Sequence, residues 1–536
     1  MKILAGSLML LSLTASAAPL RLEPRHPSSK NLIWTDGVMQ ITRPNPADVP
    51  KVGYAIVKAR PSPALHRLLP KGYSLAPLPQ TWDLNYYAVP LDSVSQLQDL
   101  AIWAHESTGM CGSIEFVRGH SLITASTQIY PPIYGSRAVF DEAKTWIETV
   151  SLAAMDQTID ALTALPSRHF RHPQGETAHT TVRQIWESQM VSARWTITEE
   201  TQPLSNQKSV VARLEGLTKP EETIIIGAHL DSILRSGSNS VDPSPGADDD
   251  ASGVAALTEI LRVIEAGQLK FDRSIELQAY AAEEAGLVGS KEIAVRYAAA
   301  GKKIAGMYQI DMAYYSKAGA SGIIHLLQDY TSRDLRRQAI DWIRLYLGPV
   351  YKLGFLPRGS ASDHKSFYDH GYPTIFPFED PSGHNPYIHS GNDTRAQFDD
   401  GLLQRRVTQL ALLFTIHQGG LQSLAAAYEP LKKDQLPEDL RQGLKIAIQN
   451  IDAQYYVSVS GPLNASTLEF CQIDDGGNPH CAQERATLGA EASGSARKFF
   501  YSTAALPLAA GQKWRVLAYD AADDLIAWRQ FSLKAP

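Results

Sequence analysis

Three strand-like apolar runs of this chain each lead into a side chain that can bind a metal. These are His229 in GAHLDS, Glu284 in AAEEAG and Asp311 in QIDM. In open α/β sheets the carboxyl ends of parallel strands lie along one edge, and ligands bind there. Chance can place one such group after a strand, but it rarely places one after each of three. The three segments therefore predict a common site at the edge of a parallel sheet.

The wider pattern supports such a sheet, because strand-like and helical stretches alternate over residues 136–424. We expect the strands at 209–214, 223–227, 274–281, 304–310 and 374–378. We expect the helices at 140–163, 180–189, 252–266, 288–300, 332–347 and 396–417. This alternation predicts an α/β fold in which a mixed, largely parallel sheet carries helices on both faces.

Two further segments add metal-type side chains. Asp249 lies in GADDDASG, between a Gly-rich loop and a predicted helix, and His389 lies in YIHSGNDT. The five side chains are then two histidines and three carboxylates, a set that suits a pair of zinc ions. Burial of the adjacent acids Asp248–Asp250 would cost solvation, and a bound divalent cation would offset that cost. Glu283 lies beside Glu284 and is left over from the ligand count.

Taken singly, each of these residues has an ordinary structural interpretation. A lone histidine is more often a satisfied core residue than a ligand, and adjacent acids often start an exposed helix because they favour its first turn. A pair of glutamates can be a charged turn. The combination of five residues at strand ends carries the prediction, not any one of them.

The length of 536 residues suggests about three domains. We expect a signal peptide at 1–18, a small N-terminal α+β domain at 19–135 and the α/β domain at 136–424. A linker at 425–450 would carry one helix at 437–448, and a β-sandwich-like domain would occupy 451–536.

The first 18 residues have the pattern of a secretory signal. Lys2 precedes the apolar stretch Ile3–Thr14, and Ala15-Ser16-Ala17 is a small-residue cleavage site. The stretch is shorter than the roughly 20 residues that span a bilayer, and no later segment is apolar enough to span one. We therefore expect a secreted protein, either extracellular or periplasmic.

The net charge and the cysteines limit which partners and which disulfide bonds we expect. A net charge of −6, with no cluster of Lys and Arg, argues against a nucleic-acid partner. Cys471 and Cys481 lie close in sequence, and an oxidising compartment would favour a disulfide between them. Cys111 is left over, and we expect a buried thiol, with a reactive nucleophile as the alternative.

Together these segments resemble the secreted bacterial leucyl aminopeptidases, which are exopeptidases with two co-catalytic zinc ions. The resemblance covers about residues 140–420 and extends to NQKSVVA at 206–212 and SDH at 362–364. It implies the zinc exopeptidase fold for the domain at 136–424. It does not cover 19–135, which by position alone resembles a prodomain that assists folding or restrains a zymogen. On that basis its removal would raise the activity or leave it intact.

The resemblance also implies the ligand roles. Two zinc ions would be held by bridging Asp249, by Glu284 with His389, and by His229 with Asp311. Asp231 would orient the His229 imidazole through a hydrogen bond. Members of this family also have a cis peptide after the bridging aspartate, here between Asp249 and Asp250.

The implied reaction is release of N-terminal residues from peptides that have a free amino group. Glu283 would be the general base, taking a proton from the attacking water and passing it to the leaving amine. The metal ions would activate that water and polarise the scissile carbonyl. An apolar substrate pocket implies a preference for leucine-like residues, and its candidates are Met312, Phe376, Phe378 and Ile388. We expect a monomer.

Two departures from the family leave the preferred residue open. Pro357–Ala361 replace a cysteine pair and an aromatic residue before SDH, and His384 replaces an aromatic residue. Three other readings share the sheet. A carboxypeptidase would need a basic cluster, for which Arg235 and Arg358 are the only obvious candidates. A glutaminyl cyclase would use one zinc ion, and a non-catalytic binding protein usually loses the ligands or the base.

Overall fold

The computed structural model describes residues 140–235 and 242–424, except 318, 320, 357–359 and 399. In the flanking regions it describes separate strands, short helical pieces and a few single residues. The predicted signal peptide, Cys111, Arg358 and the segment 118–131 lie outside the described residues.

A six-stranded sheet forms the centre of the α/β domain. In order across the sheet its strands are β14 (Thr374–Ile375), β11 (Lys303–Gln309), β9 (Lys219–His229), β10 (Arg273–Tyr280), β8 (Ser209–Leu214) and β7 (Trp195–Glu200). The first four are parallel, and β8 and β7 each pair antiparallel with the preceding strand. The sheet is therefore mixed and largely parallel, as predicted.

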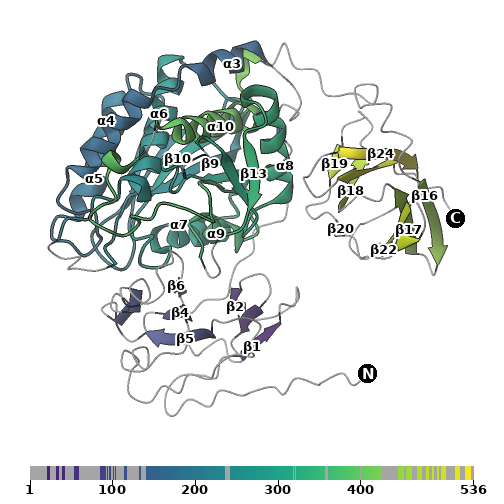
Figure 1. Ribbon diagram of the computed structural model, residues 1–536, viewed down its shortest axis with the longest axis horizontal. Helices are drawn as coiled ribbons and strands as arrows, with labels where there is room; N and C mark the ends of the chain where they lie inside the picture. The colour runs from purple at the N-terminus through teal and green to yellow at the C-terminus, as the bar shows by residue number, and fades with distance from the viewer. Residues whose placement is uncertain are drawn as a thin grey trace.

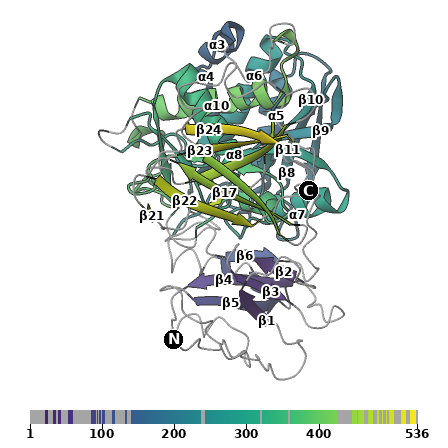
Figure 2. The ribbon, with the colours of Figure 1, turned by 90° about the vertical axis from the view of Figure 1, so that its right-hand side faces the viewer.

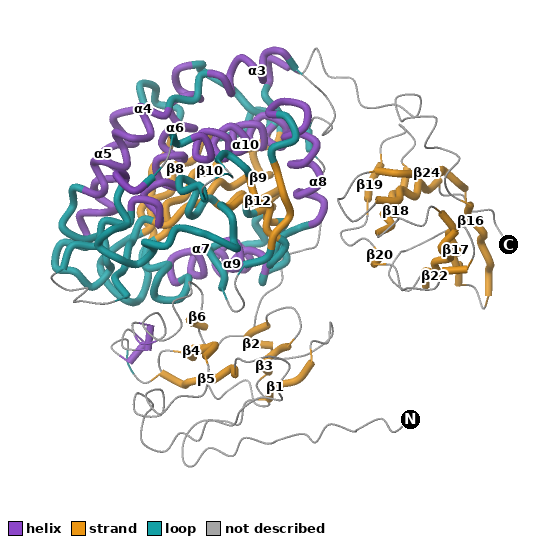
Figure 3. The backbone as a smooth tube through the Cα atoms, in the orientation of Figure 1, coloured by secondary structure: helices purple, strands orange, loops and turns teal. Residues whose placement is uncertain are grey.

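The central strands are buried on both faces. The apolar residues of β9 run continuously over 224–226, whereas β10 alternates apolar residues with polar ones that are also buried, among them Glu276 and Gln278. Ile224 and Ile226 of β9 join a large cluster on one face, whereas Ile225 joins a second cluster on the other face. Residues of the large cluster come from α3 (Asp141–Glu148), α4 (Leu152–Thr163), α5 (Glu176–Gln189), α6 (Ser252–Ala266), α8 (Arg333–Trp342) and α10 (Leu402–Gly419). The second cluster involves α7 (Val288–Ala299) and α9 (His364–Tyr368). Figure 3 shows the strands as a layer between these helices.

A small second sheet contains β13 (Tyr351–Gly354), β12 (Ile324–Leu327) and β15 (Pro377–Phe378). The single strand predicted at 374–378 is thus divided, because β14 pairs with β11 and β15 pairs with β12. Phe376 is the residue at which the chain passes from one sheet to the other.

Other boundaries also differ from the prediction. The helix expected at 140–163 is two helices, because the Ser151 hydroxyl accepts a hydrogen bond from the Ala154 amide and caps the start of α4. The helix expected from 396 begins at Leu402, after Gly401 at φ +69°. Strands β7, β12 and β13 were not predicted. No described helix has the length and apolar character that a bilayer crossing needs.

The N-terminal region contains two antiparallel sheets. One has the order β1 (Arg21–Pro24), β3 (Met39–Thr42), β2 (Leu32–Thr35), and the other β5 (Asn85–Leu91), β4 (Gly53–Ala59), β6 (Ile114–Val117). Helical residues follow Ser93, whose hydroxyl accepts a hydrogen bond from the Gln96 amide at 3.2 Å. In Figures 1 and 2, β6 is the strand of its sheet that lies nearest to the α/β domain, on the side of α7.

The C-terminal strands form two antiparallel sheets. One contains β16 (Lys445–Ile451), β17 (Gln454–Gly461), β22 (Ala496–Ser502) and β21 (Ala492–Ser493). The other contains β19 (Pro479–Cys481), β18 (Thr467–Ile473), β23 (Lys513–Tyr519) and β24 (Leu525–Ser532), with β20 (Ala486–Thr487) paired to β18. The helix predicted at 437–448 is wrong over 445–448, because these residues belong to β16, which pairs antiparallel with β17.

Candidate metal centre

The parallel strands bring the predicted ligands to one edge of the sheet. His229 is the last residue of β9 and lies opposite Tyr280, the last residue of β10. Glu284 follows in the loop after β10, and Asp311 lies two residues beyond β11. Asp249 comes from the turn before α6, and His389 from the loop after β15. All five predicted ligands are at least 95% buried.

Asp249 lies at the centre of these residues. Its Oδ1 is 3.0 Å from His229 Nε2, and its Oδ2 is 3.0 Å from His389 Nε2. Asp311 Oδ1 lies 3.7 Å from the same His229 nitrogen, and Glu284 Oε2 lies 3.3 Å from the same His389 nitrogen. The five side chains therefore form two groups that share one carboxylate, which is the grouping that the family resemblance implied.

Asp250 also lies within reach of His229 and Asp311, but its oxygens are already engaged. Its Oδ2 accepts from the His229 amide at 3.0 Å, and its Oδ1 accepts from the Gly253 amide at 2.9 Å. Neither oxygen of Asp249 has a hydrogen-bond partner among the described residues. Asp249 is thus the better bridging carboxylate, and the peptide bond between Asp249 and Asp250 is cis, as the resemblance implied.

The chemistry of the site fits zinc. Imidazole nitrogens and carboxylate oxygens are the donors that zinc takes in proteins without thiolates. Within the described ranges, His229 Nε2 and Asp311 Oδ1 are buried and make no hydrogen bond. Burial raises the pKa of Glu284 to about 7, because a buried carboxylate loses the solvation of its charge.

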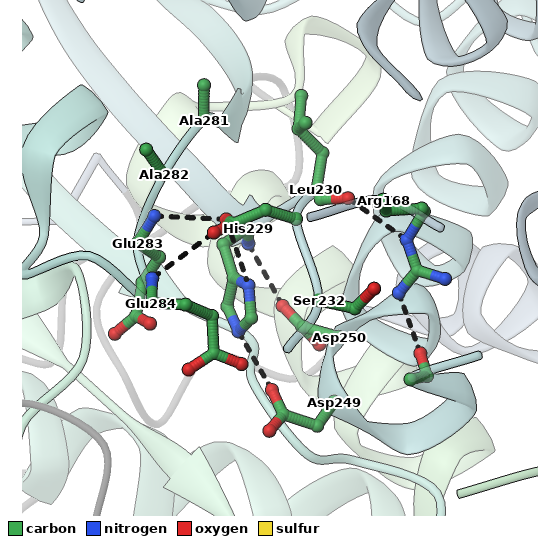
Figure 4. Close-up of polar contacts among 12 residues, drawn as sticks. Arg168, His229, Leu230, Ser232, Asp249, Asp250, Ala281, Ala282, Glu283 and Glu284 are labelled. Atoms are coloured by element: carbon green, nitrogen blue, oxygen red, sulfur yellow. Dashed lines mark hydrogen bonds and ion pairs between the residues drawn. The ribbon is translucent and has the colours of Figure 1, made fainter. Parts of the chain in front are cut away.

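Asp231 links a ligand to the loop after β10. Its Oδ1 lies 3.5 Å from His229 Nδ1, the nitrogen that faces away from Asp249. The same carboxylate accepts from the Glu283 amide at 3.0 Å and from the Glu284 amide at 3.3 Å. Figure 4 shows His229 between this loop and Asp249. Asp231 can therefore orient the imidazole and also hold the loop backbone.

Glu283 belongs to neither ligand group, although it lies next to Glu284. It is 99% buried, and neither of its carboxylate oxygens has a hydrogen-bond partner among the described residues. Burial raises its pKa well above the ordinary value; the charge of His229 opposes this, and those of Asp363 and Glu284 add to it. Glu283 is thus a carboxylate with a high proton affinity beside the metal-type residues.

Two supporting residues were not predicted from the sequence. The buried Arg168 donates from Nε to the Leu230 carbonyl at 3.0 Å and from Nη2 to the Gly246 carbonyl at 2.7 Å (Figure 4). Asp393 accepts from the amides of Asp248 and Asp249, both at 3.2 Å. Asp393 lies four residues after His389 in the HSGNDT segment, so its closeness in sequence to a predicted ligand is a signal that could have found it. Arg168 has no local signal.

The four predicted pocket residues gather in one apolar cluster. Met312, Phe376, Phe378 and Leu327 form its buried part, and Ile388 and Leu356 pack against it. Met312 follows Asp311 in the chain and Ile388 precedes His389, so the cluster adjoins both ligand groups. The Phe376 ring also lies 4.7 Å from the His364 ring of the SDH segment.

Known proteins match this part of the chain. The profile of peptidase family M28 matches residues 209–414. Leucine aminopeptidase 1 of Ajellomyces capsulatus is 31% identical over 273 residues, which is 48% of this chain and 69% of that protein. A probable aminopeptidase of Saccharomyces cerevisiae is 30% identical over 287 residues, covering 51% of this chain and 73% of the other.

Two solved structures have the same fold. The LapA aminopeptidase of Legionella pneumophila superposes with a TM-score of 0.55 at 21% identity, covering 69% of this chain and 99% of its own. LapB of Legionella pneumophila gives a TM-score of 0.55 at 24% identity, covering 69% of this chain and 100% of its own. The Ajellomyces capsulatus and Saccharomyces cerevisiae relatives are 31% and 30% identical over more than two thirds of their own length. The chain therefore belongs to peptidase family M28 and is a metallo-aminopeptidase.

Proposed function

We propose that this chain removes leucine-like N-terminal residues from peptides, using two zinc ions for which Asp249 would be the shared ligand. One observation carries the proposal: the two oxygens of the Asp249 carboxylate each lie 3.0 Å from the Nε2 atom of a different histidine. Asp311 beside His229 and Glu284 beside His389 complete the two sets of ligands. A site for one ion would not need a shared carboxylate of this kind.

Bound zinc supplies Lewis acidity, which lowers the pKa of a water molecule and polarises the scissile carbonyl. The protein's own part in proton transfer falls to Glu283. Its buried carboxylate accepts a proton from the attacking water and delivers it to the leaving amine. Asp231 keeps this carboxylate in register with His229, because it holds the Glu283 amide directly.

The apolar cluster around Met312 and Phe378 is the proposed contact for the first side chain of the substrate. Because Met312 follows Asp311 and Ile388 precedes His389, the cluster suits a peptide whose free amino group lies at the metal centre. A methylene that is gained or lost in such contact changes discrimination by about 1–3 kcal/mol, so a preference for leucine over alanine follows.

Two glutamate variants test the proposal, with leucine 4-nitroanilide as substrate and zinc content as a second measurement. Glu283→Gln should keep its zinc and lose nearly all turnover. Glu284→Gln should lose zinc as well as turnover. If Glu283→Gln turned over at the wild-type rate, the assignment of the base would be wrong.

We also propose that the protein is exported and acts as a monomer. The signal-like residues 1–18 support export. A disulfide between Cys471 and Cys481 would suit an oxidising compartment, and the backbone register of β18 and β19 supports it by placing the two residues opposite each other. Mass spectrometry of the exported protein, taken from the periplasm and the culture supernatant without reduction, would test both the removal of the signal peptide and the disulfide.

A further inference from the structure

Strand β6 of the N-terminal region lies directly against the loop that carries Glu283 and Glu284. The Phe116 amide donates to the Gly286 carbonyl at 3.3 Å. Gly286 has φ +113°, and a Cβ atom there would lie 3.1 Å from both the Ile114 carbonyl oxygen and the Phe116 nitrogen. This close approach of two backbones requires glycine at 286.

The same loop shares a hydrophobic cluster with the N-terminal sheet. The loop and its surroundings contribute Phe170, Leu204, Ala282, Ala285 and Val288. The N-terminal region contributes Ala55, Val57, Val89, Leu91, Leu97, Leu100, Ala101, Trp103, Ile114 and Phe116. Ala282 and Ala285 flank the two glutamates in sequence, so the loop has the metal centre on one side and the N-terminal sheet on the other.

Glu115 lies at the centre of this contact, and its side chain is fully buried. Its Oε2 is 3.0 Å from Lys291 Nζ and 3.1 Å from Lys365 Nζ. Lys291 belongs to α7, which follows the Glu283–Glu284 loop, and Lys365 belongs to α9, which follows Asp363. The carboxylate therefore joins the helix that follows the Glu283–Glu284 loop to the helix that follows Asp363.

The charges in this cluster balance only when Glu115 is present. Lys365 also pairs with Asp369 at 2.6 Å, so two acids face two lysines. Removing one partner of a buried ion pair leaves an uncompensated charge, which is strongly destabilising. Loss of the N-terminal sheet would remove Glu115, leave Asp369 as the acid that the described residues place beside Lys365, and expose the apolar face of the loop.

We propose that the sheet β5-β4-β6 is a permanent positioning unit of the enzyme, docked through Glu115 onto the back of the Ala282–Val288 loop, rather than a removable prodomain. Glu115 is a positioning residue, because it acts on the loop through Lys291 and Lys365, which lie on the helices α7 and α9. The inference rests on the proposed roles of Glu283 and Glu284. It runs against the expectation from sequence position that removal of 19–135 leaves activity intact or raises it.

Cleavage of the folded full-length protein tests this directly. A specific protease site is inserted between residues 118 and 131, cut after folding, and the products are separated by size exclusion in buffer and in moderate urea. We expect the two pieces to co-elute in buffer with full activity. Once urea has displaced the N-terminal piece and been removed, we expect kcat to fall at least tenfold with zinc retained, and amide exchange over 282–288 to rise. A catalytic piece that is as active alone as the intact protein would overturn the proposal.

A point variant tests the role of Glu115 without cleavage. For Glu115→Gln we expect kcat to fall roughly tenfold with KM and zinc content unchanged, and for Glu115→Asp we expect partial recovery. The matched control is Glu265→Gln, which breaks another buried pair, with Arg194 at 2.6 Å, on α6. It should lower Tm without changing kcat.

The outcomes separate this inference from the proposed function. If Glu115→Gln had a lower Tm, as the control does, but an unchanged kcat, Glu115 would be structural only and the positioning role would be wrong. An inactive Glu283→Gln variant would leave the proposed function intact in that case. A fully active Glu283→Gln variant would instead remove the proposed base, whatever the behaviour of Glu115.

Discussion

The Asp231 carboxylate accepts a hydrogen bond from the Glu283 amide at 3.0 Å. The same group lies 3.5 Å from His229 Nδ1, so one side chain couples a ligand at the end of β9 to the base after β10. The Asp231 carboxylate thus holds the residues at the carboxyl ends of the neighbouring strands β9 and β10 in a fixed position relative to each other. The relative position of ligand and base depends on this carboxylate as much as on the sheet.

Replacing Asp231 should therefore impair both metal binding and turnover. In Asp231→Asn one oxygen becomes an amide donor, so the variant cannot accept from both loop amides. We expect zinc affinity to fall by about 10–100-fold, the usual effect of losing a partner of a ligating histidine. Competition with a chromogenic chelator measures this. Asp160→Asn, at a surface pair with Arg395, is the control and should bind zinc normally; equal affinities in the two variants would contradict the prediction.

Removing the metal should lower the thermal stability of the enzyme. Without cations the buried carboxylates Asp249, Glu284 and Asp311 repel one another, whereas bound zinc stabilises the folded state by mass action. We expect the chelated protein to melt several degrees lower and to recover when zinc is restored. Differential scanning calorimetry with and without chelator checks this. In Asp249→Asn the difference in melting temperature between the chelated and the zinc-loaded protein should largely disappear. A difference as large as that of the wild type would argue against the bridging role.

Stability should fall with acidification below neutral pH. His417 is buried, its Nε2 lies 3.1 Å from the Tyr346 hydroxyl, and burial lowers its pKa to about 3. The unfolded histidine, with a pKa near 6.5, binds a proton that the folded one refuses, so the unfolded state gains protons first as pH drops. The contribution of such a histidine to the free energy of unfolding is fully present above pH 6.5. Below pH 6.5 the free energy of unfolding declines by about 1.4 kcal/mol per pH unit for each such histidine.

Urea unfolding of wild type and His417→Phe at pH 7 and pH 5 isolates this effect, because the metal site contributes equally to both proteins. The variant should lose less stability between the two pH values than wild type does. His172→Phe, at a partly exposed histidine, is the control and should match the wild-type loss. Identical pH dependence in wild type and His417→Phe would refute the explanation.

The apolar cluster should set the preference for the first residue. Phe378→Leu removes ring contacts, including that with Phe376 at a centroid distance of 5.4 Å. We expect the ratio of kcat/KM for leucine over alanine anilides to fall by about tenfold, the equivalent of roughly one methylene. Phe414→Leu, in the core on α10, should lower Tm and leave the ratio unchanged. A ratio that changed equally in both variants would show that Phe378 is only a core residue.

Much of the catalytic domain could be predicted because its signals are local. The runs at 209–214 and 252–266 match β8 and α6 at both ends. The first run is mostly apolar and lies between Lys208 and Glu215, and the second has apolar residues at helical spacing and ends before Gly267. The helix predicted at 437–448 failed over 445–448, because the β-structure there depends on pairing with β17, which no local pattern records.

The amino-acid sequence by itself determined which side chains could bind metal, because His229, Glu284 and Asp311 follow apolar runs whose strand ends must meet in a parallel sheet. Only the tertiary structure decided what holds them in place. Arg168 contacts the carbonyls of Leu230 and Gly246, and Glu115 contacts Lys365, across stretches with no common pattern. The physical reason is that such contacts depend on the packing of whole elements, whereas periodicity records only which face of one element is buried.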